Sequence, residues 1–347
     1  MVCVELVACT PFASATVTPA PIVVATVPPP TLLASPQLSG RLLFDFALGE
    51  LWSVELRTGN ATRVHTKAQV FPIQPSSPMN SVSDTLIAYA GTAFSGDGVT
   101  GRFGIYLRDQ LLLPPHDGLS YQDPTWSSDA KNLFVTRVGV APDTQITGTS
   151  GLAIQSVNIG MPLSPTTVVT NAFQPAPSPD GLRLAYIHID VTSPFSQTRS
   201  LRVRNLDTGD DHEVLSGQAF SDVYGPRWLN DQELVFAAVQ SPLLSRGHTS
   251  KPDGDGDAVN VLVDAVLGHD VAHAHSWVGN VWAVNTNSGQ LTRLTPQTFM
   301  APIVAPSPDG RFVAVMAMDG IWIMKADGTA LRRISDDGSS GSIQWVN

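Results

Sequence analysis

Cysteine is almost absent from this chain of 347 residues, which has only Cys3 and Cys9. Both precede position 10, so the rest of the chain has no thiol for a disulfide, a metal site or nucleophilic catalysis. Long apolar runs are absent too, because no stretch reaches the roughly 18 apolar residues that a membrane-spanning helix requires.

Positive charge is also scarce. Lys and Arg total 20 against 30 Asp and Glu, which gives a formal net charge of -10. Proteins that bind nucleic acid need clustered positive charge to neutralise phosphates, and the basic residues here are scattered. Nucleic acid is therefore not an expected partner.

Features of an α/β hydrolase are missing as well. The sequence contains no Gly-x-Ser-x-Gly motif, and it has no long segment with helical periodicity outside one insertion. Glycine and proline are plentiful instead, with 28 and 27 copies, and 43% of the residues are hydrophobic. This composition is typical of short strands joined by tight turns.

A hexapeptide, Ala-Pro-Ser-Pro-Asp-Gly, occurs at residues 176–181 and again at 305–310. Each copy leads into a strand-like segment. The copies begin 129 residues apart, which is three times 43, and 43 lies within the range of propeller-blade repeats. The spacing predicts further degenerate copies.

Such copies are present. Related turns precede apolar segments at Asp129 and Asp231, and each lies 51 residues from Asp180. A weaker copy surrounds Asp84, and the last copy contains Asp309. Five blade starts can therefore be assigned. These carboxylates recur at equivalent turn positions, which indicates a structural rather than a catalytic role.

Three short strands follow the last blade start, over 312–316, 321–324 and 331–334. Asp-Gly pairs separate them, and glycine provides the positive backbone angle that hairpin turns require. The repeating unit is thus predicted to be an antiparallel blade of four strands.

One blade is incomplete at the N-terminal side of the repeats. Segments 42–46, 52–56 and 61–64 provide only strands two to four, whereas the C-terminal segment 342–347 reads as an opening strand. In this segment, Trp345 occupies the position that Trp126 and Trp228 occupy in the opening strands of other blades. We predict an all-β, six-bladed propeller closed by the C-terminal strand, which leaves no open sheet edge.

The motifs resemble those of the TolB-like six-bladed propeller family. The family pattern Pro-x-Trp-Ser-Pro-Asp-Gly-x-x-Leu-Ala matches the blade starts, and residues 280–284 with 290–295 resemble its third and fourth strands. The likeness covers residues 41–347 and weakens at residues 83–85. The family also includes accessory domains of peptidases, so the resemblance implies the fold more firmly than the function. We do not expect that accessory role for this chain.

Loop length is what breaks the repeat. The connections between strands two and three are long at 91–102, 139–150 and 190–198, and an insertion of about 38 residues begins at Ser241. These connections should emerge on one face and form a crescent at the channel mouth. Rigid scaffolds commonly carry binding residues on such loops.

The insertion, assigned to 241–277, contains a candidate calcium loop. Asp253, Asp255, Asp257 and Asp264 occupy positions 1, 3, 5 and 12 of a twelve-residue segment, the layout of an EF-hand or dockerin loop. Ala258 replaces the usual glycine at position 6. The alternative is a solvated acidic turn.

The same insertion contains His248, His269, His273 and His275. The last three could form a second metal site, for zinc, because 269 and 273 could share a helical face or 273 and 275 a strand face. No cysteine or fixed ligand spacing accompanies them, which favours ordinary polar loop histidines.

The first 39 residues have a different composition. Residues 1–9 end in Leu-Val-Ala-Cys, which matches a bacterial lipobox with Cys9 as the lipidated residue, although Glu5 and the lack of a basic start depart from a complete signal. Residues 10–39 are rich in Pro, Thr and Ala and predict an extended tether before a propeller over 40–347. A chance match to the lipobox is the alternative.

Together these features predict a non-catalytic, extracytoplasmic binding or scaffolding propeller, a monomer held to the bacterial cell surface or periplasmic membrane only by its lipid anchor. Its expected partner is an envelope or surface protein, or a polar ligand, with Ca²⁺ as the one expected cofactor. The rival interpretation is a calcium-assisted hydrolase or lyase that acts on a carbohydrate or an ester.

Overall fold

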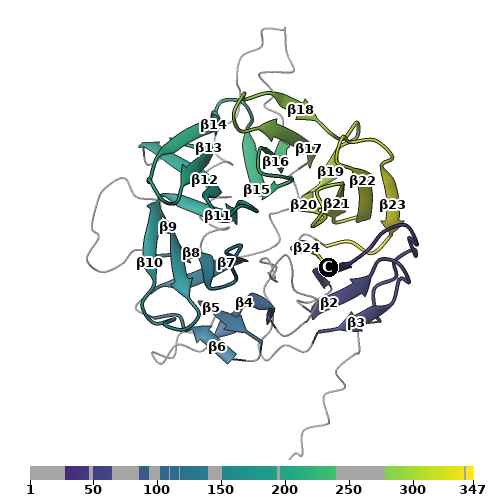
Figure 1. Cartoon of the computed structure of the whole chain (residues 1–347), viewed down its shortest axis with the longest axis horizontal. Coiled ribbons are helices and arrows are strands. Elements are labelled where there is room, and N and C mark those ends of the chain that lie inside the picture. The colour runs from purple at the N-terminus through teal and green to yellow at the C-terminus, as the bar shows by residue number, and fades with distance from the viewer. Residues whose placement is uncertain are drawn as a thin grey trace, which may run out of the picture.

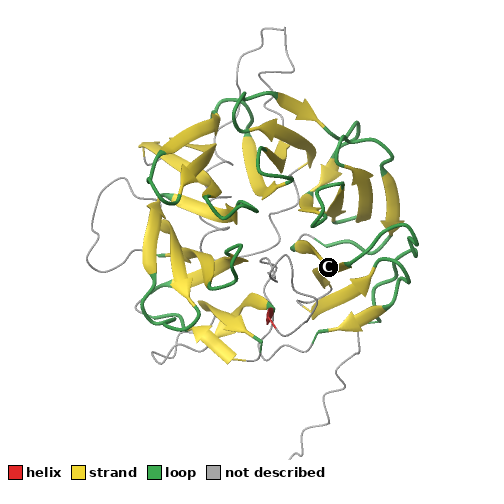
Figure 2. Ribbon diagram, viewed as in Figure 1, coloured by secondary structure: helices red, strands yellow, loops and turns green. Residues whose placement is uncertain are grey.

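The predicted all-β propeller is confirmed by a computed structural model, in which six antiparallel sheets form a ring (Figure 1). Figure 2 shows that strands and turns make up nearly all of this ring. The structure describes residues 28–46, 50–64, 86–93, 102–108, 110–116, 118–139, 151–193, 196–239, 278–339 and 341–347.

The blades are numbered from the N-terminus. Blade one contains β24 (Ile343–Val346), β1 (Arg41–Phe46), β2 (Glu50–Glu55) and β3 (Ala61–Arg63). In its described residues, blade two contains β4 (Ala88–Ala93), β5 (Arg102–Leu107) and β6 (Gln110–Leu113). Blade three contains β7 (Ser120–Trp126), β8 (Asn132–Val138), β9 (Leu152–Asn158) and β10 (Thr166–Thr170).

The remaining blades follow the same order. Blade four contains β11 (Ala172–Pro177), β12 (Arg183–Ser193), β13 (Ser196–Asn205) and β14 (Asp211–Leu215). Blade five contains β15 (Asp222–Trp228), β16 (Glu233–Val239), β17 (Val278–Asn285) and β18 (Leu291–Arg293), and the short β19 (Phe299–Met300) pairs with β17. Blade six contains β20 (Ile303–Pro306), β21 (Phe312–Ala317), β22 (Gly320–Lys325) and β23 (Arg332–Ser335).

The C-terminal strand closes the ring, as predicted. β24 pairs with β1 in antiparallel fashion, and Trp345 lies opposite Leu42. Trp126 and Trp228 each lie opposite a leucine of the second strand in their own blades. The equivalent register identifies β24 as the first strand of blade one.

The hydrophobic core lies between neighbouring blades rather than at one centre. On β21, Val313 and Val315 pack in a cluster shared with blade five, whereas Ala314 and Met316 pack in a cluster shared with blade one. Successive side chains of a strand point to opposite faces. A strand buried on both faces therefore needs the unbroken apolar run that this sequence shows.

Residues 28–39 pack against the ring. Leu32 and Leu38 are buried among side chains of blades one and six. The Leu33 amide donates to the carbonyl of Ile334 (2.7 Å), and the Ser35 amide donates to that of Leu56 (2.8 Å). This N-terminal strap, residues 28–39, thus crosses the seam where the ring closes. The composition of residues 10–39 predicts a tether, but two leucines and satisfied backbone groups fix its last part.

The expected loop at 190–198 is instead mostly strand. β12 and β13 continue beyond the length of the other blades, with Asp190 paired to Thr198. The spacing of the turns does not predict this extension, because the hairpin continues the ladder beyond the strand lengths described in the other blades.

Candidate functional site

The turns between the first and second strands lie side by side on one face of the ring. A Cβ atom on Gly181 would lie 2.3 Å from Ser128 Oγ in the preceding blade, and a Cβ on Gly310 would lie 2.5 Å from the carbonyl oxygen of Leu229. Both glycines have positive φ angles, of 76° and 68°. The repeated Asp-Gly pair therefore allows close packing between blades as well as the turn itself. We call this face, with turns 127–131, 178–182, 229–232 and 307–311, the turn face.

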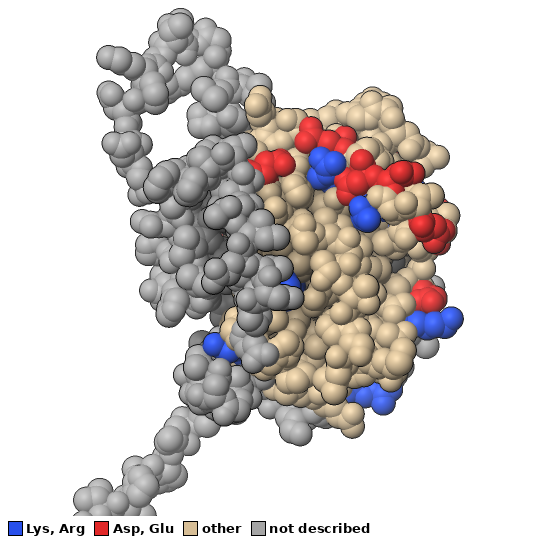
Figure 3. Space-filling model, turned by 90° about the vertical axis from the view of Figure 1, so that its left-hand side faces the viewer, with Lys and Arg blue, Asp and Glu red and all other residues tan. Residues whose placement is uncertain are grey.

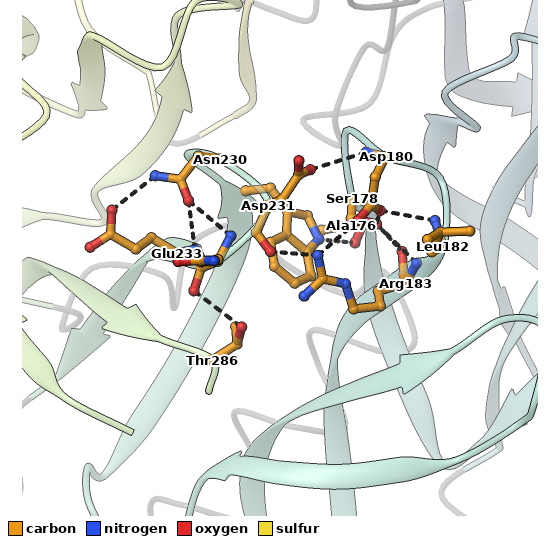
Figure 4. Close-up of polar contacts among 11 residues, drawn as sticks. Ala176, Ser178, Asp180, Leu182, Arg183, Asn230, Asp231, Glu233 and Thr286 are labelled. Atoms are coloured by element: carbon orange, nitrogen blue, oxygen red, sulfur yellow. Dashed lines mark hydrogen bonds and ion pairs between the residues drawn. The ribbon is translucent and has the colours of Figure 1, made fainter. Parts of the chain in front are cut away.

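The recurring carboxylates of the turn face hold the turns in place (Figure 4). Asp180 accepts hydrogen bonds from Ser178 Oγ and from the Leu182 amide (2.9 Å), while its own amide donates to Asp231 Oδ1 in the next blade (3.1 Å). Burial alone would raise the pKa of Asp180, but the hydrogen bonds from Ser178 and Leu182 and the contact with Arg183 lower it overall. An ionised acceptor of this kind suits a structural role and not a general acid.

Arg183 and Trp228 join blades four and five on the same face. The guanidinium of Arg183 donates to Asp180 Oδ2 (2.8 Å) and lies 5.0 Å from the centroid of the Trp228 ring. Trp228 Nε1 in turn donates to the carbonyl of Ala176 (2.8 Å). These contacts make the turn face a rigid platform.

The opposite face, where strands two and three of each blade are joined, is called the loop face. Antiparallel strands alternate in direction, so turns gathered on one face place these connections on the other. β16 and β17 stay paired as far as Ala238 and Asn280, close to the ends of the connection 240–277. A Cβ on Gly279 would lie 2.8 Å from the Ala238 carbonyl oxygen, so the ladder is tight at this point. The insertion therefore leaves and re-enters the ring at neighbouring positions of the loop face.

The base of the loop face is braced by an ion pair between blades four and five. Arg199 Nη1 lies 2.6 Å from Asp222 Oδ1, and both side chains are largely buried. The Arg199 guanidinium also lies 5.3 Å from the centroid of the Phe173 ring. Burial raises the pKa of Asp222, and the charge of Arg199 partly offsets that rise.

The first strands of blades three, four and five each contain a β-bulge that sequence reasoning missed. The register shifts near Asp123, Gln174 and Gly225, whose φ angles are 49°, 53° and 61°. A proline follows each of the three residues, which the first strand tolerates because its other edge has no ladder partner. The signal was available, because the three residues are spaced by 51 and each lies six positions before a turn aspartate.

Hydrogen bonds link the three bulges. Asp123 Oδ2 accepts from Thr136 Oγ1 (2.7 Å) and from the Gln174 amide (3.3 Å). Gln174 Oε1 accepts from the Gly225 amide in the next blade (2.8 Å). Each side chain at a bulge thus accepts the backbone N–H of the following bulge. Burial raises the pKa of Asp123 overall, whereas the hydrogen bond from Thr136 and the positive charge of Arg227 act to lower it.

Arg227 lies two residues after the last bulge and is only partly exposed. Its Nη1 donates to the carbonyl of Pro226 (2.7 Å), and no carboxylate of the described residues lies within ion-pair distance of it. Burial lowers the pKa of Arg227 to about 10, while the charge of Asp123 acts in the opposite direction. The guanidinium still carries its charge at neutral pH.

Charges on the outer side of blade four are mixed. Arg202 Nε pairs with Asp211 Oδ1 at 2.7 Å, and Arg204 lies 3.9 Å from the same carboxylate. On the side of the ring shown in Figure 3, the visible basic side chains are scattered singly, and the acidic ones gather toward the top and right of the view. The described residues on this side do not form a positively charged surface.

The site residues predicted from the sequence lie outside the described residues. This applies to Cys9, to the calcium loop Asp253, Asp255, Asp257 and Asp264, and to His269, His273 and His275. Within the described ranges, no group of three or more His, Cys, Asp or Glu side chains is placed to hold a metal ion. Nor does the described part contain a helix long and apolar enough to cross a membrane.

Solved structures share the fold at low sequence identity. TolB from Acinetobacter baumannii superposes with a TM-score of 0.58 and 15% identity over 88% of this chain and 66% of that one. Puromycin hydrolase gives a TM-score of 0.50 and 15% identity over 91% of this chain and 48% of that one. This chain thus spans just under two thirds of the TolB and about half of the hydrolase. No family model and no curated protein matches the sequence. These similarities establish that the chain has a propeller fold like that of these two proteins.

Proposed function

We propose that this chain is a non-catalytic binding propeller whose loop face contacts a protein or a polar ligand. The observation that carries the proposal is the position of the connection 240–277, which joins two tightly paired strands on a face opposite the packed turns. Scaffolds of this kind commonly place binding residues on the loops of one rigid end. The regularly repeated carboxylates, by contrast, are used within the turns.

The location follows from the N-terminal residues. We propose that the chain works outside the cytoplasm and that Cys9 carries a lipid anchor. The described strap ends the N-terminal segment on the seam between blades one and six, so an anchor upstream would hold the ring by this edge. Calcium bound by Asp253, Asp255, Asp257 and Asp264 would order the insertion for contact with the partner.

A pull-down with two matched variants tests the proposal. In the first, an Asp-Gly pair replaces residues 241–276, as Asp319-Gly320 joins the strands of blade six. In the second, the exposed turn-face residue Leu182 is changed to Ser. We expect proteins captured from envelope extracts to be lost with the first variant and retained with the second. Equal loss with both variants would refute a role for the loop face. Turnover of a carbohydrate or ester that a chelator abolishes would favour the rival enzyme.

A further inference from the structure

Arg227 carries a positive charge, and no carboxylate of the described residues lies within ion-pair distance of it. It lies on β15, which together with β7 and β11 is close to the ring axis (Figure 1). A partly buried charge without a directly paired carboxylate is costly, and proteins normally pair such groups. Asp123 attracts it, but Asp123 Oδ2 already accepts hydrogen bonds from Thr136 and Gln174.

A second donor lies on the neighbouring strand. The Gln174 side chain uses Oε1 to accept the Gly225 amide, which orients the carboxamide and leaves its two N–H groups without an acceptor among the described residues. Gln174 is partly exposed, like Arg227. In blade four, the position equivalent to Arg227 is Ala176, so the neighbouring strand offers no carboxylate at this position.

We propose that Arg227 and Gln174 bind a carboxylate near the ring axis. A guanidinium presents parallel N–H groups that match the two oxygens of a carboxylate, and a carboxamide N–H adds a third hydrogen bond. A singly charged group suits the site better than a phosphate dianion, because the Asp123 carboxylate lies close enough to repel additional negative charge. The ligand is thus a small carboxylic acid or a carboxylate of a larger molecule.

This site does not depend on the proposed function of the loop face. Arg227 and Gln174 lie on first strands, whereas the connection 240–277 joins the second and third strands of blade five. The variant that lacks residues 241–276 should therefore keep carboxylate binding, whereas it should lose the loop-face partner. Failure of one proposal can be told apart from failure of the other.

The test is a thermal-shift titration of the full chain with sodium acetate, with sodium chloride at matched ionic strength as the reference and inorganic phosphate as a second probe. We expect a saturable rise in melting temperature with acetate alone. Arg227→Gln and Gln174→Glu should each weaken the apparent affinity by about tenfold or more, since each removes a donor to a charged group. Gln174→Glu keeps an oxygen for the Gly225 amide. Arg311→Gln makes the same charge change at an exposed turn-face residue and should bind acetate normally.

Three results would overturn the proposal. These are an acetate effect no larger than that of chloride, an undiminished effect in Arg227→Gln, and tighter binding of phosphate than of acetate. If Arg227→Gln does not fold, Arg227→Lys decides, because it keeps the charge but not the paired N–H groups. We expect weaker acetate binding in Arg227→Lys, and unchanged binding would contradict the carboxylate site.

Discussion

Gln174 Oε1 accepts a hydrogen bond from the backbone amide of Gly225 at 2.8 Å and so joins the bulged first strands of two neighbouring blades. Asp123 makes the equivalent contact with the amide of Gln174. Three blades that carry or flank the long connections are thus linked at their inner edge. We infer that this linkage keeps the loop face rigid while its loops differ in length.

Removal of that acceptor should destabilise the ring. Gln174→Leu leaves the Gly225 amide without a partner in a buried position, and we expect a loss of about 1–3 kcal/mol in the free energy of unfolding. Gln122→Leu is the control, because the Gln122 side chain is also partly buried but makes no hydrogen bond with the described residues. Urea denaturation followed by tryptophan fluorescence measures both. Equal losses would argue against the linkage.

The strap should contribute to stability through one of two adjacent leucines. Leu32 is 6% exposed and packs in the seam between blades one and six, whereas Leu33 is 63% exposed. Leu32→Ala should cost about 2–3 kcal/mol of unfolding free energy, and Leu33→Ala should cost less than about 0.5 kcal/mol. Thermal melts of the two variants compare them directly. If Leu32→Ala melts like the parent, the strap is not part of the folded core.

The two roles of the repeated glycine can be separated. Gly310 has a positive φ and lies against the Leu229 carbonyl, whereas Gly289 has a φ of 69° with no atom within 4 Å of a built Cβ. Gly289→Ala should cost about 1–2 kcal/mol for the backbone angle alone. Gly310→Ala should cost more, since a backbone oxygen must also move. Similar losses measured by urea denaturation would show that the turns do not pack as tightly as described.

Asp45 should make stability depend on pH. It is buried beside β24 and accepts the Ser342 amide, and burial raises the pKa of Asp45 from 3.8 to about 7. The folded state therefore binds a proton more tightly than the unfolded state, so stability is highest at low pH and falls as the pH rises from about 4 to about 7. Asp45→Asn keeps an oxygen for Ser342 and should remove this slope.

Melting temperatures of parent and Asp45→Asn across this range check the prediction. The melting temperature of Asp45→Asn should rise relative to that of the parent as the pH rises, and this difference should level off above about pH 7. A constant difference between the two proteins would mean that Asp45 is ionised throughout the range.

Much of the fold could be predicted from the sequence, because its signals are local. Each Asp-Gly turn is recognisable by itself, and its spacing counts the blades. Trp345 identified ring closure because it repeats a position seen at Trp126 and Trp228. The bulges at Asp123 and Gln174 follow the 51-residue spacing of the turns, but the hydrogen bonds that join them reach the adjacent blade, and the spacing of turns does not reveal such bonds.

The candidate site was less predictable. The calcium loop and histidines were selected by residue type and spacing within one segment, and they lie outside the described residues. Arg227 has no motif around it, and only the fold brings its strand next to that of Gln174, with no carboxylate of the described ranges within ion-pair distance. The strap could not be predicted from composition, because the average composition of residues 10–39 does not report two well-placed leucines, Leu32 and Leu38.

The calcium loop remains a prediction with a direct test. Calcium titration by calorimetry should give a binding signal for the parent and none for the double variant Asp255→Ala with Asp257→Ala, because two of four carboxylate ligands are lost. Asp336→Ala, at an exposed surface position, is the control. Identical calorimetric traces for the parent and the double variant would show that these aspartates do not bind calcium.

The central claim is that partners bind the loop face, and hydrogen–deuterium exchange of the chain with and without its captured partner tests it most directly. The account predicts slower exchange in peptides covering 139–151 and 240–277 when the partner is bound, with unchanged exchange in the turns 178–182 and 307–311. Protection confined to those turns, with none at the loop face, would contradict it.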